Sequence, residues 1–220
     1  MTATTRRSHA ERSATTRAAL LDATLDCLAE RGYSGTTTVE VVKRAGVSRG
    51  AQVHHFPTKA ELISAALAHL LAVQRQRFAD EFAALPPRER TEEAGLRLLW
   101  SVFDGKSYRA LMQLAVASFA DPELKAAVAE VFRALERTVV EGYAEHFPVP
   151  ARRDGAERDL LFAFRAMESA ALYRELGLDD EAEHTVAVLG TLTELRDLAI
   201  GLGLDTAAAP RRRRPDPTVP

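Results

Sequence analysis

The stretch that determines the fold runs from residue 37 to residue 59 and reads TTVEVVKRAGVSRGAQVHHFPTK. Two short apolar periodicities of helical spacing flank the turn Ala45-Gly46-Val47-Ser48, and a third begins after Thr58. Thr37 followed three residues later by Glu40 has the spacing of a capping box, which favours the start of a helix. We therefore predict two short helices joined by a tight glycine turn and followed at once by a long helix. A short helix held in this way fits the major groove of DNA.

A longer helix is predicted ahead of this stretch, from Arg17 to Arg31, and Gly32 is expected to end it. Its apolar face consists of Leu20, Leu21, Thr24, Cys27 and Leu28. Cys27 lies on this stripe and is expected to be a small core residue. Residues 1–14 are polar and aperiodic, so we predict a flexible arm whose arginines either follow the minor groove or remain in solvent.

The rest of the sequence also predicts helices, so the expected fold class is all-α. They are placed near 88–104, 107–120, 122–146, 153–176 and 180–203. The expected domains are a DNA-binding domain over 15–60 and a helical regulatory and dimerisation domain over 61–205. The proline-rich and arginine-rich tail, 206–220, is expected to be disordered.

Composition limits the classes of protein that the chain can belong to. Hydrophobic residues make up 46% of the sequence, enough to bury a core, and no apolar run reaches the roughly 18 residues of a membrane span. A single cysteine cannot form an internal disulfide, which indicates a reducing cytoplasm. Residues 1–60 carry 9 Lys and Arg against 5 Asp and Glu, whereas residues 61–220 carry 20 against 26. This asymmetry suggests that the first quarter faces a polyanion.

Three segments together resemble the DNA-binding domain of the tetracycline-repressor (TetR) family. They are Gly32-Tyr33-Ser34-Gly35-Thr36-Thr37, Ala45-Gly46-Val47-Ser48-Arg49-Gly50 and His54-His55-Phe56-Pro57-Thr58-Lys59-Ala60-Glu61-Leu62. The resemblance covers residues 15–65 by motif and the remainder only by the number and length of helices. It implies an all-helical homodimer that represses transcription at a near-palindromic operator and leaves DNA when a small molecule enters the C-terminal domain.

The resemblance also implies which residues meet DNA. They are Thr37, Ser48, Arg49, Gly50, Ala51, Gln52, Val53, His54, His55 and Lys59. Thr37, His55 and Lys59 match phosphate contacts of the family. Arg49, at the start of the recognition helix, can hydrogen-bond guanine through its two-pronged set of donors.

Two positions depart from the family pattern. Val53 stands where a tyrosine is common and cannot donate a hydrogen bond, although its methyl groups can contact thymine. Gln52 replaces an apolar residue, and it either reads adenine or is satisfied inside the domain. His54 and His55 are DNA contacts or packing residues.

Enzymatic alternatives find little support in the sequence. Residues 46–50 spell G-x-S-x-G, the turn that carries the nucleophile of α/β-hydrolases, but that chemistry needs a strand before the serine and a sheet around it. The six histidines are scattered and one cysteine cannot supply a zinc cluster, so no metal or cofactor is expected. A helical enzyme with an incidental DNA-binding domain is the weakest of our hypotheses.

The second domain is expected to bind the effector and to form the dimer. The residues proposed to line a ligand chamber are Trp100, Phe103, Met112, Gln113, Phe164 and Glu168. The residues proposed for a two-fold, four-helix interface are Leu161, Phe164, Ala171, Val188, Leu192 and Leu195. The alternative within the family is a DNA-binding protein that answers to a protein partner or has no effector.

Overall fold

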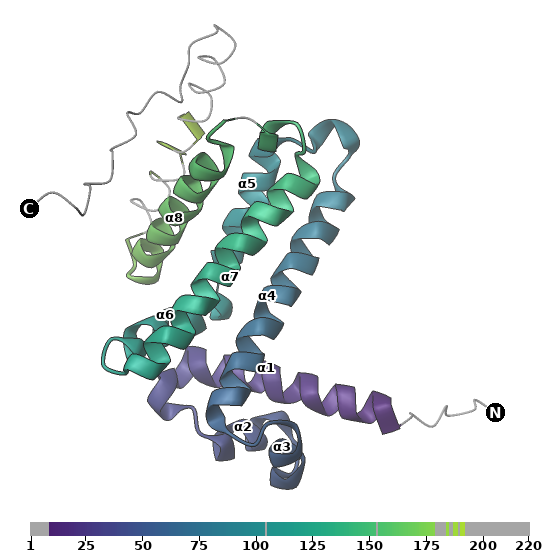
Figure 1. Ribbon diagram of the computed structural model, residues 1–220, viewed down its shortest axis with the longest axis vertical. Coiled ribbons are helices and arrows are strands. Elements are labelled where there is room, and N and C mark those ends of the chain that lie inside the picture. Colours follow the sequence, from purple (N-terminus) through teal and green to yellow (C-terminus); the bar gives the residue numbers. More distant parts are fainter. Residues whose placement is uncertain are drawn as a thin grey trace, which may run out of the picture. The chain divides into compact units, whose positions relative to one another are not determined.

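All regular elements in the described part of the computed structural model are helices, which confirms the predicted all-α class (Figure 1). The structure describes residues 9–103, 105–152 and 154–178, together with residues 184, 187, 188, 190 and 191. The α-helices in this part are α1 (His9–Gly35), α2 (Thr38–Ala45), α3 (Arg49–His55), α4 (Lys59–Ala84), α5 (Glu92–Trp100), α6 (Lys106–Ser118), α7 (Pro122–His146) and α8 (Ala156–Glu175). Short 3-10 helices are η1 (Pro87–Glu89), η2 (Ser101–Phe103) and η3 (Pro150–Arg152). Most of the helix predicted at 180–203, and all of the predicted tail, lie outside the described residues.

Helix α1 is longer than predicted at its amino end, because it begins at His9 rather than Arg17. Residues 9–14 of the predicted arm are therefore helical. This segment contains good helix formers, an acidic Glu11 in the first turn and no glycine or proline. It lacks an apolar period because the core begins only at Leu20. Gly32 adopts φ 66° and ψ −178° and kinks the helix at the predicted stop.

A compact apolar core holds α1, α2, α3 and the first turns of α4 together. The predicted face of α1 is fully buried. Its Leu20, Leu21 and Cys27 pack in one cluster with Val41 of α2, Phe56 after α3, and Leu62 and Ala66 of α4. Val47 packs against this core from the turn between the short helices, as expected for the residue after Gly46. The core fixes how α3 is presented to the outside.

The chain divides into two compact units at residue 147, and the predicted boundary between a DNA-binding and a regulatory domain near residue 60 stays a prediction. The first unit, Met1–His146, includes α1 to α7, because α1 packs against both α4 and α6 and α4 continues without a break to Ala84. The second unit, Phe147–Pro220, includes α8. Within the described residues no single helix is long and apolar enough to span a bilayer; α3 and α4 reach the required length and composition only as a pair bent by 74°.

Candidate nucleic-acid interface

Three hydroxyl side chains cap the helices of the predicted helix-turn-helix. Thr37 Oγ1 accepts from the amide of Glu40 at 3.2 Å, Ser48 Oγ from that of Ala51 at 3.1 Å, and Thr58 Oγ1 from that of Glu61 at 3.1 Å. Gly46 takes the left-handed conformation, φ 66° and ψ 29°, that turns the chain between α2 and α3. The two short helices, the glycine turn between them and the long helix after them are therefore confirmed (Figure 1).

One half of the expected capping box does not form. The Glu40 carboxylate, predicted to reach back to its cap, instead forms an ion pair with Arg31 of α1 at 2.9 Å. This pair ties the first turn of α2 to the end of α1. Thr37 itself remains exposed, with its side chain at the amino end of α2.

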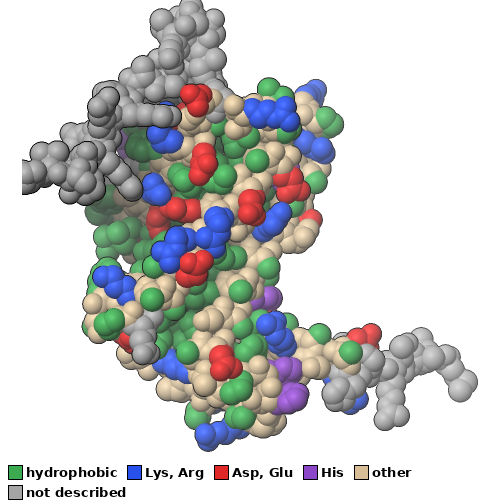
Figure 2. All heavy atoms as spheres, viewed as in Figure 1, with side chains coloured by type: hydrophobic (Ala, Val, Ile, Leu, Met, Phe, Trp, Pro, Cys, Tyr) green, Lys and Arg blue, Asp and Glu red, His purple; other side chains and the backbone are tan. Residues whose placement is uncertain are grey.

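The exposed face of α3 has four residues predicted to meet bases. Arg49, Gly50, Val53 and His54 are exposed; Ala51 and His55 are half-buried. The side chain of Val53 keeps 48% of its surface accessible, so its methyl groups are available for contact. Figure 2 shows histidine side chains gathered with Lys or Arg side chains at the end of the first unit where α3 lies.

Gln52 is not part of this face, and of the two roles left open for it the structure fits the one inside the domain rather than the reading of adenine. It is only 2% exposed, and its side-chain nitrogen donates to the carbonyl oxygen of Phe56. The amide thus satisfies a carbonyl at the end of α3 from inside the core. The spacing of four between Gln52 and Phe56 was the signal in the sequence, since residues at i and i+4 share a helix face.

Lys59 lies in the first turn of α4 but is half-buried. Its ammonium donates to the carbonyl oxygen of Tyr33 at 2.7 Å and lies 4.0 Å from the centroid of the Tyr33 ring. Burial lowers the pKa of Lys59 below its ordinary value. This side chain links α4 to the segment after the kink of α1, a role that the sequence did not predict.

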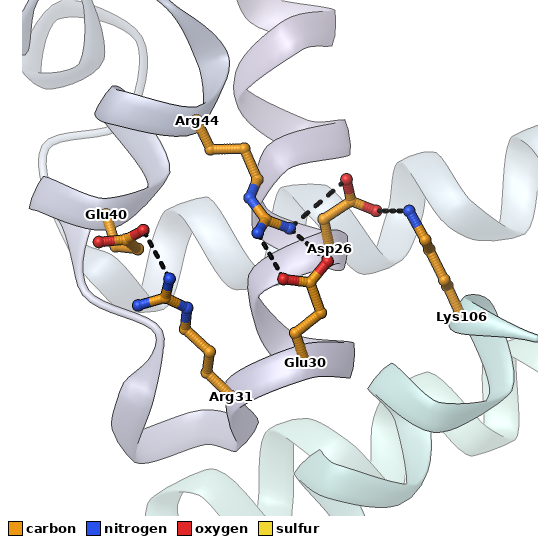
Figure 3. A network of polar contacts seen from close by, with 6 residues as sticks. All are labelled: Asp26, Glu30, Arg31, Glu40, Arg44 and Lys106. Carbon is orange, nitrogen blue, oxygen red and sulfur yellow. Dashed lines mark hydrogen bonds and ion pairs between the residues drawn. The ribbon is translucent and has the colours of Figure 1, made fainter.

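A network of ion pairs behind the interface joins α1, α2 and α6 (Figure 3). Arg44 of α2 makes a two-pronged pair with Glu30 and lies 3.7 Å from Asp26, and Lys106 of α6 contacts the same aspartate at 3.0 Å. The hydrogen bonds between these two side chains lower the pKa of Glu30 and raise the pKa of Arg44. No pattern in the sequence predicts this network, because it pairs residues as many as 80 positions apart.

The residues proposed to line a ligand chamber are distributed over both units. In the first unit, the rings of Trp100 and Phe103 are 6.2 Å apart between centroids, and Phe103 is 3% exposed. Gln113 is exposed, and its Oε1 lies 2.9 Å from where a Cβ on Gly32 would stand. Its side chain lies against the kink of α1, and its role in a ligand chamber stays a prediction.

The other proposed chamber residues differ in their burial and lie on two helices. Met112 is half-buried on α6; Phe164 and Glu168 lie in the second unit, on α8, and are buried and half-buried respectively. The ligand chamber itself remains a prediction.

The proposed dimer residues are only partly exposed. Phe164 and Ala171 are buried, at 2% and 0% exposure, so they are not available to a second copy and their assignment to the interface is wrong. Leu161 is half-buried and Val188 exposed, whereas Leu192 and Leu195 lie outside the described residues. The exposed apolar side chains of α8 and the turn that follows it are Phe162, Leu172, Tyr173, Leu176 and Leu178.

Comparison with known proteins identifies the helix-turn-helix as that of a family of transcriptional regulators. Residues 20–66 match the family model described as bacterial regulatory proteins, tetR family. The HTH-type transcriptional regulator CymR of Pseudomonas putida is 38% identical over 120 residues, which are 54% of this chain and 59% of CymR. The regulator BetI of Burkholderia cenocepacia is 32% identical over 150 residues, 64% of this chain and 74% of BetI. The chain thus spans about three fifths of the length of CymR.

Solved structures extend the likeness in fold to most of the described chain. A putative TetR-family transcriptional regulator from Rhodococcus sp. superposes with a TM-score of 0.65 at 19% identity, over 81% of this chain and 98% of that one. A putative transcriptional regulator from Saccharomonospora viridis, solved in complex with choline, superposes with a TM-score of 0.60 at 17% identity. The match covers 82% of this chain and 96% of that one. The chain belongs to the TetR family.

Proposed function

We propose that this protein binds duplex DNA through α3 and acts as a transcriptional repressor. The observation that carries the proposal is the exposed face of α3, where Arg49, Val53 and His54 are held outward by a helix-turn-helix whose core is fully packed. A single α-helix fits the major groove, and an arginine at its start can hydrogen-bond the O6 and N7 atoms of guanine. Membership of the TetR family supports the same function.

We propose further that the active form is a homodimer that includes α8 in its interface. Phe162, Tyr173 and Leu176 are 60%, 43% and 67% exposed. Their spacings of 11 and 14 residues place them within an arc of about 60° around a helix of 3.6 residues per turn. In the described part of the chain this stripe is exposed, and a two-fold axis would bury it against its own copy. Two copies of α3 would then meet successive major-groove faces of a near-palindromic site.

We propose that a small molecule controls the affinity for DNA. The Saccharomonospora protein of similar fold was solved in complex with choline, which supports a small organic cation as the class of effector. In this chain, Trp100, Phe103 and Tyr108 form an aromatic group with centroid separations of 6.2 and 5.8 Å. Aromatic faces attract quaternary ammonium groups, so choline is the first compound to test.

The experiment that tests the proposed function is selection of genomic fragments by the purified full chain. We expect a near-palindromic motif among the bound fragments, with half-sites about one helical turn apart or a multiple of it. Sedimentation of the complex then gives the number of chains on each duplex. Titration of choline into the complex, with a change in fluorescence anisotropy as the readout, tests the effector separately. A protein that enriches no motif and binds no duplex at low salt contradicts the proposal.

A further inference from the structure

We propose that Arg17 of α1 is an additional contact to a DNA phosphate, at the wall of the major groove beside the carboxyl end of α3. The inference rests on the proposed DNA-binding function and adds a second element to it. The match to the family model begins after this residue, at residue 20, and the contacts that the resemblance implies lie in α2 and α3 with their caps and at the start of α4.

The position of Arg17 follows from its contact with Phe56. The guanidinium carbon lies 5.4 Å from the centroid of the Phe56 ring, and Phe56 is the residue that ends α3. Phe56 is 5% exposed, so its ring is a fixed platform, whereas Arg17 is exposed. The ring of His55 is 6.2 Å from that of Phe56, and the ring of His54 is 5.4 Å from that of His55. Arg17 therefore continues, from another helix, the row of side chains along the end of α3.

The charge of Arg17 is available for a ligand. Two other arginines of the first unit, Arg31 and Arg44, form ion pairs with Glu40 and Glu30. In the described part of the chain, no carboxylate forms an ion pair with Arg17. Its observed contact is with the face of an aromatic ring, and this leaves the donors at the edge of the guanidinium free. Those donors match the paired oxygens of a phosphate diester.

The dimensions of DNA explain why this position meets phosphate rather than a base. An α-helix with its side chains is roughly 10–12 Å wide, and the major groove is about 12 Å wide. Once α3 fills the groove, a side chain immediately beside it has no room among the bases. It meets the sugar–phosphate wall instead.

The test compares Arg17→Gln with the matched control Arg88→Gln in the full chain. Arg88 is 86% exposed in its side chain and lies beyond the far end of α4, about 39 Å from its first turn. The probe is a fluorescein-labelled 30-base-pair duplex of random sequence, and binding is followed by anisotropy over a series of KCl concentrations. We expect the slope of log affinity against log salt to become shallower by about 0.9 in Arg17→Gln, the value for one phosphate contact. Arg88→Gln should keep the wild-type slope.

Two further measurements separate this role from its rivals. Arg17→Lys keeps the charge and should restore most of the slope. The melting temperature of each variant reports packing on Phe56: a lower melting temperature in Arg17→Gln with an unchanged slope assigns Arg17 to stability alone and overturns the proposal. A wild-type protein that binds no duplex overturns the proposed function itself, and that result is visible before any variant is compared.

Discussion

The ammonium of Lys59 lies 2.7 Å from the carbonyl oxygen of Tyr33 and 4.0 Å from the centroid of the ring of the same residue. One side chain of α4 thus makes a hydrogen bond and a cation–π contact with the segment just after the kink of α1. Because α2 begins a few residues later, at Thr38, Lys59 fixes the path of the chain into the helix-turn-helix. The TetR family pattern implies a phosphate contact for this lysine, but in the free protein its charge is directed inward.

The first prediction separates these two roles of Lys59. Lys59→Ala should lower the free energy of unfolding by about 2 kcal/mol, since a hydrogen bond from a charged group and a cation–π contact are both lost. For a protein of this size that corresponds to a melting temperature lower by roughly 4–8 °C. Lys43→Ala, which removes an exposed lysine of α2, should leave the melting temperature unchanged. If Lys59→Ala instead melts like the wild type and loses a full unit of salt dependence, the lysine is a phosphate contact only.

The second prediction concerns Arg49, the exposed cation at the start of α3. Arg49→Ala should weaken binding to the selected operator by about 1–3 kcal/mol and relax the preference at one base pair, because a two-pronged contact with guanine is lost. Competition between the operator and a set of single-base variants measures both effects. Equal losses on every sequence would place Arg49 on the phosphate backbone instead.

The third prediction follows from the burial of Gln52. Gln52→Met keeps the volume but leaves the carbonyl oxygen of Phe56 without its donor, so stability should fall by about 1–3 kcal/mol. The pattern of base preferences should stay that of the wild type, because the side chain does not reach the surface. Urea unfolding and the same set of operator variants provide the two measurements. A changed preference at one base pair would show that Gln52 leaves the core when DNA binds.

The elements nearest to the turn were predictable because local chemistry specifies them. Thr37, Ser48 and Thr58 each place an oxygen where the free amides of a helix start need an acceptor, and all three form the expected caps. The apolar stripe of α1 was equally clear, since five residues recur at helical spacing and all are buried. These signals require no knowledge of the rest of the fold.

The remaining features depend on contacts between distant segments. Asp26 is shared by Arg44 and Lys106, and nothing in a single sequence indicates that these three residues meet. The interior position of Gln52 was left open, because a helix of seven residues has too few turns for its buried face to be assigned from polarity. The first turns of α1 were predicted as an arm because helix propensity without an apolar period is a weak signal.

The fourth prediction is a dependence on pH that arises from Glu30. Its folded pKa lies below the ordinary value of about 4.3, so the stabilisation from its pair with Arg44 is complete above that pH and is lost as the pH falls through the folded pKa. Glu30→Gln should therefore melt below the wild type at pH 7, and the difference should shrink below about pH 4.3. Glu93→Gln, which removes a looser exposed pair with Arg97 at 3.4 Å, should change the melting temperature little at either pH. A difference that persists unchanged at the lowest pH would contradict the assignment to ionised Glu30.

The fifth prediction joins the kink of α1 to Gln113 of α6. Gly32 occupies φ 66° and ψ −178°, a region that side chains rarely adopt, and an added Cβ would lie 2.9 Å from Gln113 Oε1. Gly32→Ala should cost about 1–3 kcal/mol from the backbone alone and more from the displaced amide. The double variant Gly32→Ala with Gln113→Ala should recover only the part of the lost stability that comes from the clash with Gln113. Truncating Gln113 cannot change the backbone dihedrals, so the rest of the loss should remain.

The control for this pair is Gly142→Ala, because Gly142 lies in the helix α7 and an added Cβ there meets nothing within 4 Å. It should be neutral or raise stability by up to about 1 kcal/mol, as alanine favours helix over glycine. A double-mutant cycle on urea unfolding gives the coupling between positions 32 and 113, which we expect to exceed about 0.5 kcal/mol. Full recovery of stability in the double variant would mean that the kink carries no backbone strain. In that case the only barrier to a side chain at position 32 would be the amide of α6 that lies against it.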